Sequence, residues 1–113
     1  MKTFKFDYDS ENDDLFAYLD GCKSEGAVEL GNFILDFDKK GNLVAMEILN
    51  ATDFLSKILS KIIEIAKIKE LKIEILNFRN MDAIKFQIIS EHGSEMANIL
   101  MPHIKEKSPV LMN

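Results

Sequence analysis

The sequence contains few of the residues that form crosslinks or membrane anchors. Its 113 residues include one cysteine, two prolines and no tryptophan. A single cysteine, Cys22, cannot form an internal disulfide bond, so the fold must depend on a hydrophobic core. The first residues, MKTFKFDYDS, lack the apolar stretch of a secretory signal, and no segment resembles the roughly 20 apolar residues of a membrane span. We therefore expect a cytoplasmic protein with no membrane partner.

Positive charge is also scarce. Nineteen acidic residues against fourteen basic ones give a formal net charge of −5, which is the wrong sign for attracting a phosphate backbone. Arg79 is the only arginine, so the chain has one candidate for a bidentate grip on phosphate or guanine. We therefore expect no nucleic-acid partner.

The chain has the length and apolar content of one domain. Hydrophobic residues make up 47% of it, and no polar linker divides it. The C-terminal residues carry lysines and Pro109 without a periodic pattern. The sequence predicts a single domain over residues 1–104 and a loosely ordered tail over residues 105–113.

Two β-hairpins are predicted in the first half of the chain. Residues 3–8 alternate between apolar and polar types, and a polar turn separates them from the apolar residues 15–19. Residues 32–38 and 42–49 flank a three-residue loop whose Gly41 suits the left-handed position. In the simplest register of this second hairpin the cross-strand partners are Phe37 and Leu43, Leu35 and Ala45, and Phe33 and Glu47.

The second half is predicted to begin with one amphipathic helix over about residues 53–68, capped by Asn50 or Thr52. Residues 71–75 and 84–88 then alternate as strands do, while residues 95–101 fit a strand or a short helix, with strand favoured. The predicted fold class is α+β, with antiparallel hairpins, one helix and a further antiparallel segment of two or three strands. The apolar helix positions are Phe54, Leu55, Ile58, Leu59, Ile62, Ile63 and Ala66.

One segment has the spacing of a calcium-binding loop. Asp36, Asp38, Gly41 and Glu47 occupy its first, third, sixth and twelfth places. Lys40 puts an ammonium group where an oxygen ligand belongs, and the flanking residues predict strands instead of helices. A hairpin with a coincidental match is therefore the favoured interpretation.

A second group of carboxylates lies in the first predicted turn. Asp7, Asp9, Asp13 and Asp14 could hold a hard cation through their oxygens, but their spacing matches no known loop. A solvated turn with local hydrogen bonds is the favoured alternative.

Glu47 is the strongest candidate for a functional carboxylate. In the register above it lies beside Phe33 on an apolar face, where lost solvation would raise its pKa unless it finds a partner. Perturbed carboxylates occur at functional sites and in structural pairs alike.

No catalytic residue and no cofactor are predicted. Cys22, His92 and His103 fall in expected loops or the tail, and no motif brings them together as a triad or a zinc site. Glycine-rich phosphate loops are missing too.

Two stretches of the first half resemble a known family. They are YDSENDDLFAYL, residues 8–19, and ILDFDKKGNLVAMEILNAT, residues 34–52. Both are similar to family 2283 of the domains of unknown function, although Ala45 stands where that family commonly has glycine and Thr52 where it has serine. The resemblance implies a small β-rich domain and no established activity.

Two classes of function follow from these patterns. The favoured one is a non-enzymatic interaction module that associates with itself or with a protein partner, because both faces of the second hairpin look apolar and one helix can cover only one of them. The alternative is a small acidic metal-binding protein or hydrolase that uses Glu47 and the aspartate-rich turns.

Overall fold

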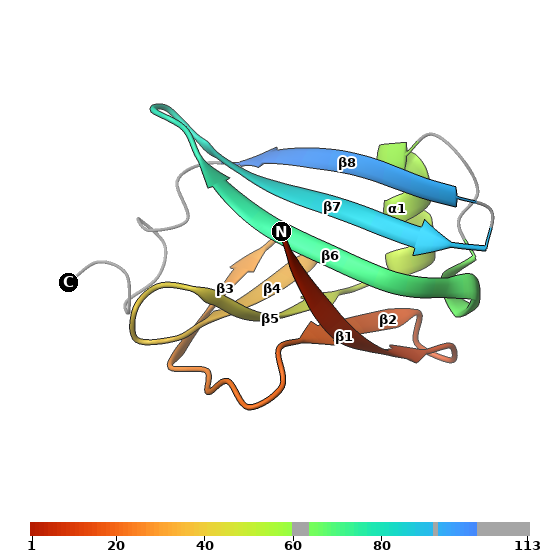
Figure 1. The fold of residues 1–113 in the computed structure, drawn as a ribbon, viewed down its shortest axis with the longest axis horizontal. Coiled ribbons are helices and arrows are strands. Elements are labelled where there is room, and N and C mark those ends of the chain that lie inside the picture. Colours follow the sequence, from red (N-terminus) through yellow and green to blue (C-terminus); the bar gives the residue numbers. More distant parts are fainter. Residues whose placement is uncertain (60–63, 92, 102–113) are drawn as a thin grey trace.

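The computed structural model describes residues 1–59, 64–91 and 93–101, and it shows a β-rich fold. Eight strands form one antiparallel sheet in the order β3-β4-β5-β2-β1-β6-β7-β8, with one short helix (Figure 1). The predicted α+β class is therefore wrong. The strands are β1 (Lys2–Asp9), β2 (Asp14–Tyr18), β3 (Gly26–Leu30), β4 (Phe33–Phe37), β5 (Leu43–Ile48), β6 (Ile68–Asn77), β7 (Asp82–Ser90) and β8 (Gly93–Met101); the helix is α1 (Ala51–Leu59).

Strand β1 joins the two groups of strands that the sequence predicts. Its first residues pair with β6, with Phe4 opposite Leu71, whereas residues 5–9 pair with β2. The sheet therefore curls at β1, and β6 to β8 lie over β3, β4 and β5 (Figure 1). Phe33 of β4 and Phe86 of β7 stack between the two layers, with their ring centroids 5.9 Å apart.

The core lies between these layers and follows from strand alternation. Phe4, Leu35 and Phe86 are each at most 3% exposed, and each points inward from its strand. Burying a side chain of this size contributes about 1.5–3 kcal/mol before the entropy cost. Helix α1 adds Leu55, which is buried, and Phe54, whose ring meets Phe33 edge to face at 4.9 Å.

The predicted helix over residues 53–68 is too long. Helix α1 ends at Leu59, a single 3₁₀ turn covers Ile65–Lys67, and β6 begins at Ile68. Residues 60–63 of the prediction lie outside the described residues. Isoleucine is β-branched and favours strands, so the isoleucine-rich end of the helical pattern is equally suited to leading into β6.

Most predicted strands are confirmed. Both hairpins form, the loop after Asp38 closes with Gly41 at a φ of +84°, and residues 95–101 belong to strand β8. Strand β3 was missed, because a five-residue segment that begins with Gly26 and contains the charged Glu29 gives only a short apolar signal. The predicted tail, residues 105–113, lies outside the described residues. Within the described residues, no helix is long and apolar enough to cross a membrane.

The predicted register of the second hairpin is wrong beyond its first pair. Phe37 lies opposite Leu43 as predicted, but Asp36 then pairs with Ala45, so Val44 forms a bulge. Every later residue of β5 changes face as a result. Met46 and Ile48 join the core, Glu47 lies opposite Ile34 on the outer face, and the expected second apolar face does not form.

Helix α1 is capped by a residue from the turn between β1 and β2. The Asp13 carboxylate accepts hydrogen bonds from the Thr52 amide at 3.0 Å, the Thr52 hydroxyl at 2.7 Å and the Tyr8 hydroxyl at 2.6 Å. The Asp13 carbonyl also accepts one from the Ala51 amide. Asn50, at a φ of +52°, is not in the extended conformation of a usual capping residue, so the predicted caps are replaced by Asp13.

These contacts make the contribution of Asp13 to stability depend on pH. Partial burial raises the pKa of Asp13, but hydrogen bonds from Tyr8 and Thr52 outweigh this and hold it below the ordinary aspartate value. Its stabilising contribution is therefore complete above about pH 4, the ordinary aspartate pKa, and is lost as the pH falls through the lower pKa of the folded state.

We predict that Asp13→Asn lowers the free energy of unfolding by about 1 kcal/mol at neutral pH, and by less at about pH 3. Asparagine tolerates the φ of +53° at this position but loses the charge and one acceptor oxygen. Urea denaturation at the two pH values measures the difference. Asp7→Asn is the matched control, since Asp7 is exposed on β1, and an equal loss in both variants would contradict the capping role.

Candidate functional site

Two of the candidate cation ligands, Asp9 and Asp38, stabilise turns. Asp9 accepts hydrogen bonds from the backbone amides of Glu11 and Asn12, and Asp38 accepts them from the amides of Lys40 and Asn42. These bonds lower the pKa of both carboxyl groups, with Asn12 and Asn42 making the largest contributions. The two side chains are at separate turns, as expected for local turn stabilisation.

The bulge brings three other carboxylates together on the outer face of the first layer. Glu47 lies opposite Phe16 of β2 and Ile34 of β4, between Asp14 and Asp36. A hydrogen bond with the Asp14 carboxyl, partial burial, and the negative charges of Asp14 and Asp36 raise the pKa of Glu47. Burial also raises the pKa of Asp36. The raised pKa of Glu47 has the direction that was predicted, but Asp14 and Asp36 contribute to it as well as burial, and Glu47 lies on the outer face instead of beside Phe33.

An aromatic pair lies beside these carboxylates. Phe16 is 40% exposed, and its ring stacks on Tyr18 of the same strand with the centroids 5.6 Å apart. Asp7 of β1 lies opposite Phe16 on the same face. The outer face of the first layer therefore combines exposed aromatic surface with negative charge.

The residues predicted as ligands do not assemble as the calcium-loop spacing suggests. Asp36 and Glu47 share the outer face, whereas Asp38 is held in the hairpin loop. Within the described ranges, no three histidine, cysteine, aspartate or glutamate side chains are arranged to hold a metal ion. Cys22 is an exposed free thiol, and His92 and His103 lie outside the described residues.

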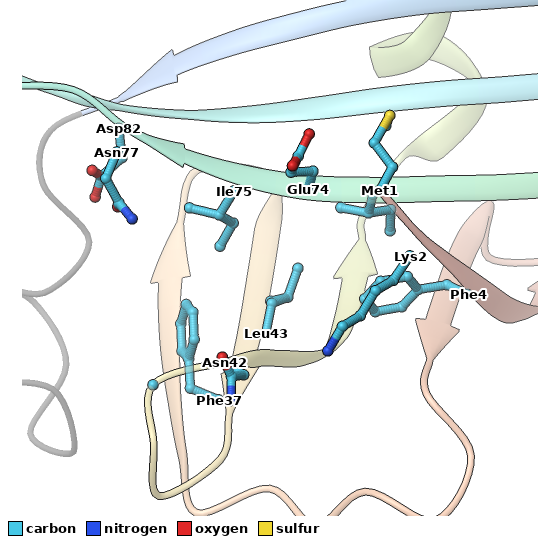
Figure 2. Close-up of a pocket in the computed structure, with 12 residues that line it drawn as sticks. Met1, Lys2, Phe4, Phe37, Asn42, Leu43, Glu74, Ile75, Asn77 and Asp82 are labelled. Atoms are coloured by element: carbon cyan, nitrogen blue, oxygen red, sulfur yellow. The ribbon is translucent and has the colours of Figure 1, made fainter.

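A cavity of about 430 Å³ opens between the two layers at the start of β1 (Figure 2). Strand residues from four elements supply most of its apolar surface. Of its lining residues, Gly41 alone belongs to a candidate site from the sequence, the calcium-loop spacing. Lys2 borders it together with Asn42, and Asp82, which is 1% exposed, lies at another part of its wall. The apolar lining consists of Met1, Phe4, Phe37, Leu43, Ile73 and Ile75.

The sequence contains one partial signal for this cavity. Lys2 continues the alternation of Phe4, Phe6 and Tyr8, so it belongs to the inward face of β1. A lysine in that position indicates that the inward face reaches an opening at this end. The cavity itself also needs β6, which pairs with β1 across about 70 positions of sequence, with Lys2 opposite Ile73.

The raised pKa of Glu47 leads to a prediction for Glu47→Gln. Glutamine can donate a hydrogen bond to Asp14 without adding a like charge, so we expect the free energy of unfolding at pH 7 to rise by up to about 1 kcal/mol after solvent screening. Because a raised pKa means that ionisation of Glu47 opposes folding, this gain should disappear below about pH 4, where glutamate is protonated.

Thermal and urea denaturation at the two pH values test this expectation. Glu29→Gln, on exposed strand β3, makes the same change of charge and serves as the control. A loss of stability in Glu47→Gln that exceeds the loss in Glu29→Gln would show that the Glu47 carboxylate has a stabilising partner.

Comparison with known proteins shows sequence similarity over part of the chain. A protein of Methanocaldococcus jannaschii described as uncharacterised is 48% identical over 48 residues, which are 42% of this chain and 41% of that protein. A protein of Methanosarcina mazei provisionally named hypoxanthine phosphoribosyltransferase is 39% identical over 49 residues, which are 43% of this chain and 40% of that protein.

These similarities are confined to a segment in each case. The matched parts cover about two-fifths of the length of each of these curated relatives. No solved structure matches the chain. The model of the family described as protein of unknown function DUF2283 matches residues 5–51, which span β1 to the first residue of α1, and this confirms the resemblance predicted for the first half of the chain.

Proposed function

We propose that the protein is a non-enzymatic interaction module that associates with a second copy of itself through the free edge of strand β8. The observation that supports this is the length and composition of that edge. Strand β8 spans Gly93–Met101 and pairs with β7 on one side, and it is the last strand in the sheet order. Among the described residues no strand pairs with its other side, so the backbone groups on that side form a template for a further strand.

Strand β8 lacks the features that usually protect such an edge. Between Gly93 and Met101 there is no lysine, arginine or proline, and Glu95 is the single charged residue. Met96 and Leu100, which are 51% and 63% exposed, lie on the same outward face. Natural proteins usually interrupt a long apolar edge with charge, proline or a bulge, because it otherwise recruits another chain.

The opposite edge of the sheet provides a contrast within the same molecule. Strand β3 has only five residues, and the exposed Glu29 lies near its centre. A short edge with a central charge resists pairing. Of the two edges, β8 is therefore the one suited to a partner strand.

A two-fold axis through Asn98 gives a consistent antiparallel arrangement. Residue pairs in such an interface are symmetric, so Met96 of one copy lies opposite Leu100 of the other. Directly opposed apolar side chains stabilise a strand pair by about 0.2–1 kcal/mol each. The carboxylates of the outer face of the first layer, Glu47 and Asp36 among them, would repel each other if copies stacked face to face, which favours the edge instead.

The alternative of an acidic metal-binding protein or hydrolase is less well supported. The register predicted from the sequence set Glu47 beside Phe33, which put Glu47 and Asp36 on opposite faces of the hairpin. Because the structure brings Glu47 together with Asp14 and Asp36, this objection to a shared carboxylate site is removed. Glu47, however, shares a hydrogen bond with the Asp14 carboxyl group, and the negative charges of Asp14 and Asp36 repel its carboxylate. This supports an exposed acidic surface more directly than a reaction.

We predict that the double variant Met96→Lys, Leu100→Lys abolishes self-association. In the proposed interface each lysine lies opposite a lysine of the other copy, and directly opposed like charges destabilise a strand pair. Light scattering coupled to size-exclusion chromatography should give the mass of a dimer for the unmodified chain and that of a monomer for the variant, across the micromolar range.

Ala27→Lys on strand β3 is the matched control, because it adds charge to an exposed position of the other edge and should leave the dimer intact. Thermal denaturation should show that all variants remain folded, since the substituted side chains are exposed. A monomeric mass for the unmodified chain at high micromolar concentration would refute the proposal. A monomeric Ala27→Lys variant would move the interface to β3.

A further inference from the structure

The geometry points to the cavity between the two layers as a binding site for a small carboxylic acid with an apolar body. Its volume of about 430 Å³ falls within the range of about 300–1,000 Å³ that is typical of small-molecule sites. This site is distinct from the β8 edge, because the cavity lining that the structure describes includes no residue of β8. The inference therefore stands or fails independently of self-association.

The apolar part of the cavity is built from both layers. Phe4 and Ile73 come from the paired strands β1 and β6, and Phe37 comes from β4 across the cavity. Leu43 and Ile75 are half-buried, and Figure 2 shows them projecting toward the space between the layers. A ligand that covers these two side chains removes apolar surface from water, which favours an apolar body.

Lys2 supplies the charge that selects an acid. It lies on the inward face of β1, and Figure 2 shows its side chain extending toward the hairpin of β4 and β5. In the part of the chain that the structure describes, no hydrogen bond or ion pair involves the Lys2 ammonium group. Glu74 also borders the cavity, but it alternates with Ile73 and Ile75 and its side chain points away (Figure 2).

The second charged group of the cavity sets the orientation of the ligand. Asp82 is almost completely buried and has an interaction of its own. Its negative charge disfavours an anion at that end of the cavity. A bound carboxylate therefore lies at the Lys2 end beside Asn42, where a charge-assisted hydrogen bond forms, and the apolar body extends between Leu43 and Ile75.

Three probes with the same apolar chain separate the contributions of body and head group. Octanoate, octan-1-ol and octylamine, each below its micelle concentration, are titrated into the isotopically labelled full chain with no tag before Met1. NMR shifts of the amides of Phe4, Leu43 and Ile75 report occupancy. We expect octanoate to bind about tenfold more tightly than octylamine, since one charge-assisted contact is worth about that ratio.

Variants assign the preference to named residues. Lys2→Met should weaken octanoate about tenfold and leave octan-1-ol binding unchanged. Lys39→Met, an equal change of charge on the neighbouring loop outside the cavity lining, should alter neither. Leu43→Trp, which fills the cavity, should abolish binding of both probes while thermal denaturation shows a folded protein.

Three results would overturn the inference. Octylamine binding as tightly as octanoate would exclude selection of an acid, and octanoate affinity that Lys2→Met leaves unchanged would exclude the ammonium group as its cause. The third is a lack of amide shifts at millimolar concentrations of all three probes, which would exclude the cavity as a site for such ligands.

Discussion

The fold depends on strand β1 pairing with two different strands. Its first residues continue into the β6 ladder and the rest into the β2 ladder, so one strand connects both layers. A hairpin alone is marginally stable in water, because one face of its apolar side chains remains uncovered. Because β1 holds the layers against each other, Phe33 and Phe86 can stack and shield one another from water. The cavity lies at the end of β1 where the two layers are further apart.

Local patterns in the sequence were sufficient for most strands but not for the way in which they pair. Alternation located β1, β6 and β7, an apolar stretch after a polar turn located β2, and the loop ending at Gly41 predicted the hairpin of β4 and β5. Alternation gives the face of a strand but says nothing about its neighbour. The pairing of Lys2 with Ile73 joins residues far apart in sequence, so two predicted groups of strands became one sheet and the α+β class was wrong.

The candidate site was predicted less well than the strands, because its position depends on one extra residue in strand β5. Strict alternation through β5 placed Glu47 beside Phe33, whereas the bulge at Val44 moved it to the outer face with Asp14 and Asp36. Bulges have no reliable sequence signal at a valine between two apolar residues. The capping role of Asp13, which the sequence suggested only as a candidate cation ligand or a turn residue, was missed for a similar reason, since its partner Thr52 lies 39 positions away and only the folded chain reveals the helix cap.

The two proposed surfaces occupy different elements, and this bears on how they could influence each other. Residues of β1, the hairpin of β4 and β5, and β6 form most of the cavity, while β8 contributes the free edge. Strand β7 connects them directly, because Asp82 borders the cavity and pairs with Met101 at the end of the β8 ladder. An added strand at β8 extends a ladder that is already fully paired from Gly93 to Met101, so it requires no movement of the cavity walls. The free energies of binding at the two surfaces should therefore be nearly additive. Coupling requires a connecting element with two arrangements, and the β7–β8 ladder has a single arrangement.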